Sequence, residues 1–224
     1  METYSRHSFQ KYCAKYNLEY QRITEPKLAF KHPTWERFDL WVDRSWWEKY
    51  DQIMYVDSDV IALPHAGNIF QEYPEINEKL KTCYYPKFRG ATPDGAKYNQ
   101  RVNPLADNYT GEQIMQRFVQ PGVMMLNKMS TEFMLPWISK YKEVTDDRID
   151  DGMFLNGCIV DSKVPLLDMQ RMYNHKNNGE KFDYNKVNFL HCAGGKKHKR
   201  NVKIWSKLED IFPDVEVDLS GLEV

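Results

Sequence analysis

The sequence predicts one α/β domain over residues 1–224, with a mixed, mostly parallel sheet, helices on both faces and a site at the carboxyl ends of the strands. Three short apolar runs, at residues 53–56, 120–127 and 187–191, are typical of strands, and segments with helical spacing lie between them. No repeat, low-complexity stretch or linker divides the chain, whose 224 residues are enough to bury a sizeable core.

Composition narrows the classes of protein. Hydrophobic residues make up 42% and charged residues 28%, which is ordinary for a globular domain. The net charge of -1 gives no electrostatic reason to expect nucleic acid as a partner. No apolar run has the length of a membrane span, and the amino terminus lacks the hydrophobic region of a signal peptide. The four cysteines have neither zinc-site nor redox spacing, so we expect reduced thiols in a cytoplasmic protein.

The remaining elements follow from periodicity. Apolar residues at helical spacing predict helices at residues 4–17, 33–47, 130–146 and 202–212, where Ser130 can cap the third and Pro213 stops the last. Short strands are expected at residues 18–23 and 81–85, and a short helix at residues 67–73. Residues 86–111 are polar and rich in Gly, Pro and Asn, which predicts a long loop of the kind that is usually functional or disordered.

The run at residues 53–56 predicts a buried strand that ends in two carboxylates, Asp57 and Asp59. Residues two apart in an extended chain project to the same side, so both carboxylates can face one point. Such oxygen ligands favour Mn²⁺ or Mg²⁺, ions that usually share their coordination with substrate phosphates. The alternative interpretation is that both are turn residues leaving a strand.

Two other runs end or begin in residues suited to a ligand. Gly122 would let another group approach the backbone closely, although an ordinary buried strand can also begin with a glycine. The run at 187–191 ends at His191, and Lys197 follows after two glycines. An imidazole can bind Mn²⁺ and an ammonium suits a phosphate, but a lone histidine at a strand end is more often a structural residue.

In this order, the Asp-x-Asp of residues 57–59, the Gln120-Pro-Gly122-Val segment and the His191-x-x-Gly194-x-x-Lys197 segment resemble motifs of nucleotide-sugar glycosyltransferases with the GT-A (Rossmann-like) fold. The resemblance is closest to the families of glycogenin, the bacterial lipopolysaccharide galactosyltransferases and the plant xylosyltransferases. It implies that Asp57, Asp59 and His191 bind the metal. It also implies that the donor contacts Arg37, Asp57, Ser58, Gln120, Gly122, Gly194 and Lys197. Arg37 on an amphipathic helix can equally be a solvated or snorkelling side chain.

A further segment resembles the Asp-Gln-x-x-Leu-Asn pattern of these families through Asp151, Leu155 and Asn156, with Gly152 in place of the usual Gln. The resemblance implies that Asp150 or Asp151 bonds the sugar hydroxyls or takes a proton from the acceptor. Either carboxylate can instead cap a helix. The histidine motif favours retention of configuration, whereas a carboxylate base would suit inversion, so the stereochemistry stays open.

The expected function is therefore Mn²⁺- or Mg²⁺-dependent transfer of a sugar from a nucleoside diphosphate, with UDP expected, to a hydroxyl of a saccharide or other acceptor. The alternatives are a catalytically silent nucleotide-sugar-binding protein and a sugar-phosphate nucleotidyltransferase, which would be expected to carry a Gly-rich loop near the amino terminus. Proteins of this fold normally open with a strand that contacts the nucleobase. This chain begins at the helix expected after that strand, so we expect the usual first strand to be missing.

Overall fold

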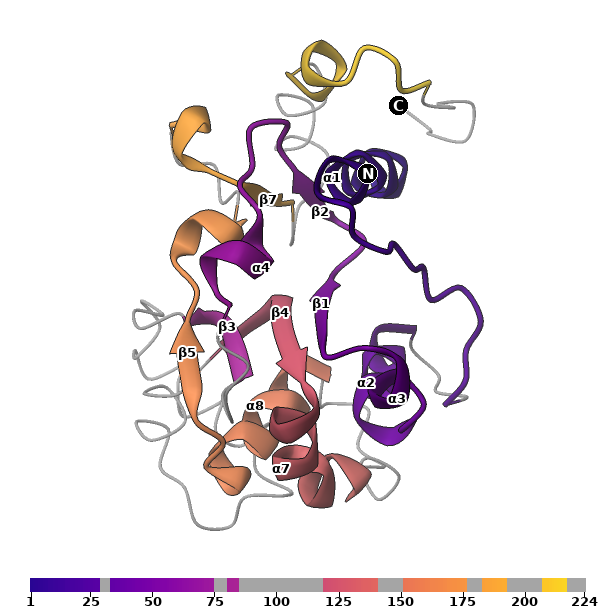
Figure 1. Ribbon diagram of the computed structural model, residues 1–224, viewed down its shortest axis with the longest axis vertical. Coiled ribbons are helices and arrows are strands. Elements are labelled where there is room, and N and C mark those ends of the chain that lie inside the picture. Colours follow the sequence, from indigo (N-terminus) through magenta and orange to yellow (C-terminus); the bar gives the residue numbers. More distant parts are fainter. Residues whose placement is uncertain are drawn as a thin grey trace. The chain divides into compact units, whose positions relative to one another are not determined.

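The computed structural model describes residues 1–28, 33–74, 80–84, 119–140, 151–176, 183–192 and 207–216. The chain divides into two compact units, each described by itself below (Figure 1). The first unit consists of residues 1–21, 56–73 and 171–224, and the second of residues 22–55 and 74–170. Each unit carries one mixed sheet. A single glycosyltransferase domain over residues 1–224 stays a prediction.

The first unit is built on a three-stranded sheet of order β2-β7-β6, in which β2 and β7 are antiparallel and β6 and β7 are parallel. Its elements are α1 (Glu2–Tyr16), β2 (Val60–Ala62), α4 (Ile69–Glu72), η3 (Arg171–Tyr173), β6 (His175–Lys176), η4 (Tyr184–Lys186) and β7 (Phe189–His191). Residues 207–211 form a last helical stretch, ahead of Pro213. The ends of the strand predicted at 187–191 and of the helix predicted at 4–17 thus agree with β7 and α1 to within two residues.

Aromatic packing fixes β7, the strand that leads to His191. The ring of Phe189 lies 5.2 Å from Phe9, 5.3 Å from Tyr12 and 5.2 Å from Tyr173, centroid to centroid, and all four rings are buried. Helix α1 contributes Phe9 and Tyr12, and packs against β2. Edge-to-face pairs of this kind add to the burial of their area. The end of β7 therefore has a position set by the core of the unit.

The second unit is built on a four-stranded sheet of order β1-β4-β3-β5, with β3 antiparallel to β4 and parallel to β5 (Figure 1). Its elements are η1 (Pro33–Phe38), α2 (Asp39–Val42), α3 (Trp46–Lys49), β1 (Gln52–Val56), β3 (Leu80–Tyr84), β4 (Val119–Asn127), α7 (Lys128–Ile138), α8 (Asp151–Ser162) and β5 (Leu166–Asp168). The last residue of β1, Val56, falls in the range of the first unit. Helices α7 and α8 pack against each other and against β4, and the core they share includes Phe38, Trp41, Met134 and Phe154.

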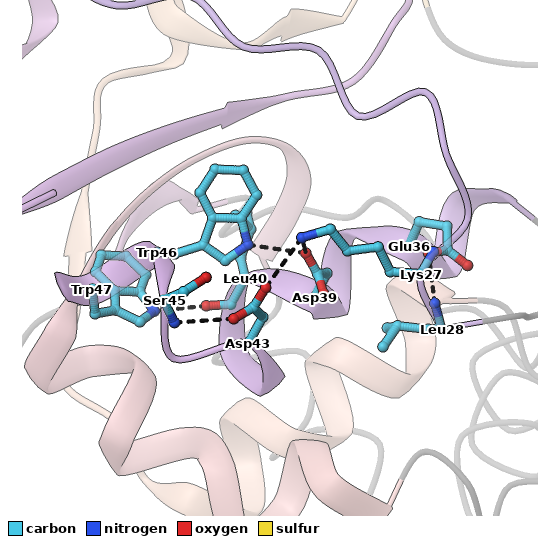
Figure 2. Close-up of polar contacts among 9 residues, drawn as sticks. All are labelled: Lys27, Leu28, Glu36, Asp39, Leu40, Asp43, Ser45, Trp46 and Trp47. Carbon is cyan, nitrogen blue, oxygen red and sulfur yellow. Dashed lines mark hydrogen bonds and ion pairs between the residues drawn. The ribbon is translucent and has the colours of Figure 1, made fainter. Parts of the chain in front are cut away.

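The helix predicted over residues 33–47 is instead three short helices, η1, α2 and α3. The break falls at Asp43, which is extended and whose carboxylate accepts a hydrogen bond from the Ser45 N–H at 3.0 Å, a local bond that competes with the helix. The Lys27 ammonium lies between Asp39, at 3.0 Å, and Asp43, at 3.1 Å (Figure 2). Figure 2 also shows the Trp46 Nε1–H donating to Asp39. Ser45, within the range of the predicted helix, is exposed.

Three further expectations were wrong in part. Residues 18–23 form no strand and are mostly exposed. Strand β1, expected to be buried, is only half-buried at all five positions, and it stands at the edge of the described sheet beside β4. The cap of α7 is Asn127, which accepts from the Ser130 N–H while the Ser130 hydroxyl accepts from the Asn127 N–H. Residues 141–150, where the predicted helix continued, and the loop at 86–111 lie outside the described residues.

Within the part of the chain that the structure describes, no helix has both the length and the apolar character needed to span a bilayer. Cys13, Cys158 and Cys192 are free thiols. Burial raises the pKa of Cys13 to about 11 and that of Cys158 further still, so both thiols stay protonated and inert in the core.

Candidate functional site

Asp57, Asp59 and His191 converge at one end of the sheet in the first unit. Asp57 directly follows β1, and Asp59 directly precedes β2. The antiparallel pairing of β2 with β7 sets Val60 opposite His191, and the Cys192 N–H donates to the Asp59 carbonyl at 2.9 Å. As a result, one carboxylate oxygen from each aspartate and one ring nitrogen of the histidine all lie within 4.8 Å of one another.

The three side chains differ in exposure. His191 is 2% exposed, whereas the side chain of Asp59 is 38% exposed. The Nε2 atom of His191 lies 3.3 Å from Oδ1 of Asp59, and its Nδ1 atom lies 2.7 Å from Oδ1 of Asn174. A turn in which the Val60 N–H donates to the Asp57 carbonyl at 3.0 Å shapes the Asp-x-Asp segment. The imidazole is therefore held by a buried contact, while both aspartates are partly exposed.

This donor set fits a hard divalent cation. Two carboxylate oxygens and one imidazole nitrogen suit Mn²⁺ or Mg²⁺, and three protein ligands leave further positions for water or substrate oxygens. Two carboxylates at this separation repel each other, and a cation between them offsets that repulsion. Burial, and then the Asp59 carboxylate, raises the pKa of the neighbouring Cys192 thiol to about 12.

Arg37 and Asp151 form a buried ion pair in the second unit. Nη2 of Arg37 lies 2.8 Å from Oδ2 of Asp151, and their side chains are 4% and 13% exposed. The rest of the guanidinium is also engaged, since Nε donates to the Thr34 carbonyl at 3.0 Å and Nη1 to the Pro121 carbonyl at 3.4 Å. Its Cζ lies 5.0 Å from the ring centroid of Tyr55. The pair thus connects η1, β4, β1 and the first residue of α8.

The other residues expected at the site have separate places. Gln120 and Gly122 lie near the start of β4, half-buried and buried respectively. Ser58 is exposed in the turn between β1 and β2. Asp150, Gly194 and Lys197 lie outside the described residues. The structure therefore brings together the three predicted metal ligands, and separately Arg37 with Asp151.

Two asparagines bond to parts of the expected site, and the sequence analysis assigned neither of them these contacts. Asn156 of α8 accepts from the Val119 N–H at 2.7 Å and donates to the Val119 carbonyl at 3.1 Å, which pins the start of β4. Asn156 belongs to the Asp-Gln-x-x-Leu-Asn pattern described above, so the sequence did mark this residue as a candidate. Asn174 precedes the two-residue strand β6 and had no signal, because its contact with His191 depends on the pairing of β6 with β7.

No protein-family model matches the chain, and no curated protein matches its sequence. Solved structures, in contrast, match its fold. One is a glycosyltransferase involved in the glycosylation of the major capsid of PBCV-1, with 14% identity, a TM-score of 0.57, and coverage of 90% of this chain and 93% of that one. Another is the apo structure of the bifunctional glycosyltransferase WbbM, with 13% identity, a TM-score of 0.52, and coverage of 76% of this chain and 33% of that one. At these identities the likeness concerns architecture, and the chain therefore has the GT-A fold of the glycosyltransferases.

Proposed function

We propose that this chain is a metal-dependent glycosyltransferase that moves a sugar from a nucleoside-diphosphate donor, with a UDP-sugar expected, to a hydroxyl group of a saccharide or other acceptor. One fold can host many functions, so the site has to carry the argument. The observation that carries it is the convergence of Asp57, Asp59 and His191 into a donor set for a hard divalent cation. The fold supports the same interpretation.

In the proposal, Asp57, Asp59 and His191 hold Mn²⁺ or Mg²⁺. When bound, the ion supplies Lewis-acid stabilisation of the charge that grows on the leaving diphosphate. The chain's own part is to fix the ligands before the donor arrives. The β2 and β7 pairing holds the backbone of Asp59 beside His191. Gly194 and Lys197 are proposed to surround and neutralise the diphosphate, on the resemblance of their motif alone.

Arg37, Ser58, Gln120 and Gly122 are retained as proposed donor contacts. A carboxylate already paired with a guanidinium accepts a proton less readily, which supports Asp151 as a hydrogen-bond acceptor for a sugar hydroxyl rather than as a base. Asp150 is retained as the alternative base. We propose retention of configuration on the resemblance of the histidine motif, and a cytoplasmic location on the reduced cysteines.

The test is release of free UDP from a panel of UDP-hexoses and UDP-pentoses, with and without Mn²⁺. We expect Mn²⁺-dependent release that Asp59→Ala lowers by at least about 100-fold, since loss of a direct ligand costs more than the 10- to 100-fold typical of residues behind the ligands. The matched control is Asp51→Ala, because Asp51 is an exposed aspartate at the bend before β1 and should leave turnover unchanged.

The same panel separates the alternatives. A silent binding protein would bind UDP with Mn²⁺ in calorimetry and release nothing from any UDP-sugar. A nucleotidyltransferase would form pyrophosphate from UTP and a sugar phosphate. If the protein neither binds UDP-sugars with Mn²⁺ nor turns them over, the proposal is wrong.

A further inference from the structure

We propose that Asn174 is a positioning residue that holds His191 in the Nδ1–H tautomer and so directs the Nε2 lone pair at the cation site. The inference rests on the proposed function, because it concerns the same site. Asn174 and His191 are 1% and 2% exposed, so their contact is shielded from water. Nδ1 of the ring lies 2.7 Å from Oδ1 of Asn174, a short hydrogen-bond distance.

The chemistry of that contact selects the tautomer. An amide oxygen accepts hydrogen bonds and cannot donate them, so a bond between these two atoms needs the proton on Nδ1. In a neutral ring the other nitrogen then carries a lone pair. Nε2 is also the atom that faces the carboxylates, 3.3 Å from Oδ1 of Asp59. Two acceptors at this distance are stabilised when a cation lies beside both.

Asn174 is itself held in place on the backbone side. Tyr173, immediately before it, is fully buried, stacks edge-on against Phe189 at 5.2 Å and donates its hydroxyl to Glu72. One residue further back, the Met172 carbonyl accepts from the Asn188 N–H at 2.8 Å. The amide thus reaches His191 from a segment anchored to both α4 and the approach to β7. A side chain on such a fixed base can orient a ligand, as partners behind metal-bound histidines do.

The first measurement is the tautomer of His191 in the metal-free wild-type protein, from a long-range ¹⁵N–¹H NMR spectrum. It is recorded at a pH where signals of doubly protonated rings have disappeared. The protein has six histidines, and the absent signal in His191→Gln identifies the right one. We expect the Nδ1–H form. The Nε2–H form would overturn the inference without any variant having to fold.

The second measurement is Mn²⁺ affinity, by calorimetry, of three variants. Asn174→Ala removes the acceptor and should weaken binding by about 10- to 100-fold, with His191 moving towards the Nε2–H form. Asn174→Asp keeps an acceptor at the same place and should restore both the tautomer and most of the affinity. Asn188→Ala is the matched control, because this half-buried asparagine contacts the Met172 sulfur at 3.4 Å from the same neighbourhood, and it should change neither readout.

The outcomes separate this inference from the proposed function. Tight Mn²⁺ binding by the wild type with equal binding by Asn174→Ala overturns the role of Asn174 and leaves the metal site standing. No Mn²⁺ binding by the wild type overturns both. If Asn174→Ala does not fold, the wild-type tautomer and the affinity of Asn174→Asp decide, because a role in packing alone would not preserve the Nδ1–H signal.

Discussion

The cluster of Asp57, Asp59 and His191 and the pair of Arg37 and Asp151 use similar chemistry in opposite ways. In the pair, both side chains are at least 87% buried and their charges compensate each other at 2.8 Å. In the cluster, two carboxylates of like charge converge, and the side chain of Asp59 is 38% exposed. The two charges of the pair compensate each other inside the fold, whereas the side chains of the cluster form a donor set that fits a divalent cation. The comparison shows that this chain places charged side chains in two ways: buried and paired with each other, or partly exposed and gathered where a ligand could bind.

The first way to break the comparison is Arg37→Met, which leaves Asp151 without its guanidinium partner. Removing one member of a buried ion pair typically costs about 3–5 kcal/mol, because a charge stays in a poorly solvated place. We expect a loss of that size in the free energy of unfolding, measured by urea denaturation followed by tryptophan fluorescence. Trp35 and Trp41, which report on it, belong to the core of the same unit.

The matched variant is the double change Arg37→Met with Asp151→Leu. Apolar side chains of similar volume replace buried ion pairs at little net cost, so most of the lost stability should return. A single Arg37→Met protein as stable as the wild type would mean that the pair is solvated in solution. The contrast with the open cluster would then disappear.

The outcome for the sequence predictions follows the same division. The strands β4 and β7 were predicted well from their apolar runs, because both strands are largely buried and their hydrophobic residues are contiguous. Asp57, Asp59 and His191 were predicted as ligands from their chemistry and the order of their motifs, and the structure brings the three side chains together. The partner of Asp151 was not predicted, since Arg37 lies far away in sequence and nothing local marks a pairing across η1 and α8. Asn174 was missed because β6 has only two residues and no periodicity.

The predicted helix at residues 33–47 failed for a comparable reason. Trp35, Phe38 and Trp41 have helical spacing and are buried, as expected. Hydrophobic periodicity could not predict that the Asp43 carboxylate accepts a hydrogen bond from the Ser45 N–H. It also could not predict that Lys27, from the preceding segment, binds Asp39 and Asp43 (Figure 2). Side-chain bonds to the backbone end helices without changing hydrophobic periodicity.

An intermediate case, Lys27→Met, sharpens the comparison. Asp39 is 3% exposed and would lose one charged partner, but it keeps the Trp46 Nε1–H bond at 2.9 Å. Because Lys27 itself is 46% exposed, we expect a loss of about 1–2 kcal/mol in unfolding free energy, between those of a buried and a surface pair. The control is Lys49→Met in α3, an exposed lysine over the Tyr50 ring, with an expected change of about 0.5 kcal/mol or less.

The same cluster predicts a small acid sensitivity. Hydrogen bonds from Ser45, and then the Lys27 ammonium, hold the pKa of Asp43 below its ordinary value of 3.8. A carboxyl group with a lowered folded pKa stabilises the protein above its ordinary value, and this contribution is lost as the pH falls through the lowered one. The gap in unfolding free energy between the wild type and Lys27→Met should therefore begin to narrow as the pH falls below 3.8, and narrow further as it falls through the lowered pKa. A gap that stays constant into acid would count against the carboxylates as the partners of Lys27.

The smallest expected effect on stability belongs to Asp59→Asn in metal-free protein. The change keeps the shape of the side chain and removes one of two converging like charges at a partly exposed position, so we expect unfolding free energy to change by about 0.5 kcal/mol or less. Mn²⁺ should then separate the two proteins. A ligand that binds only the folded state stabilises it by about 2.7 kcal/mol at 100 times its Kd, so the Tm of the wild type should rise with added Mn²⁺ while that of Asp59→Asn stays almost constant. Arg37→Met with Asp151→Leu is the converse control, because its Tm should rise with Mn²⁺ as the wild type does if the pair is structural. A large metal-free loss in Asp59→Asn would show instead that this carboxylate stabilises the fold as Asp151 does, and the distinction between a closed pair and an open cluster would have to be abandoned.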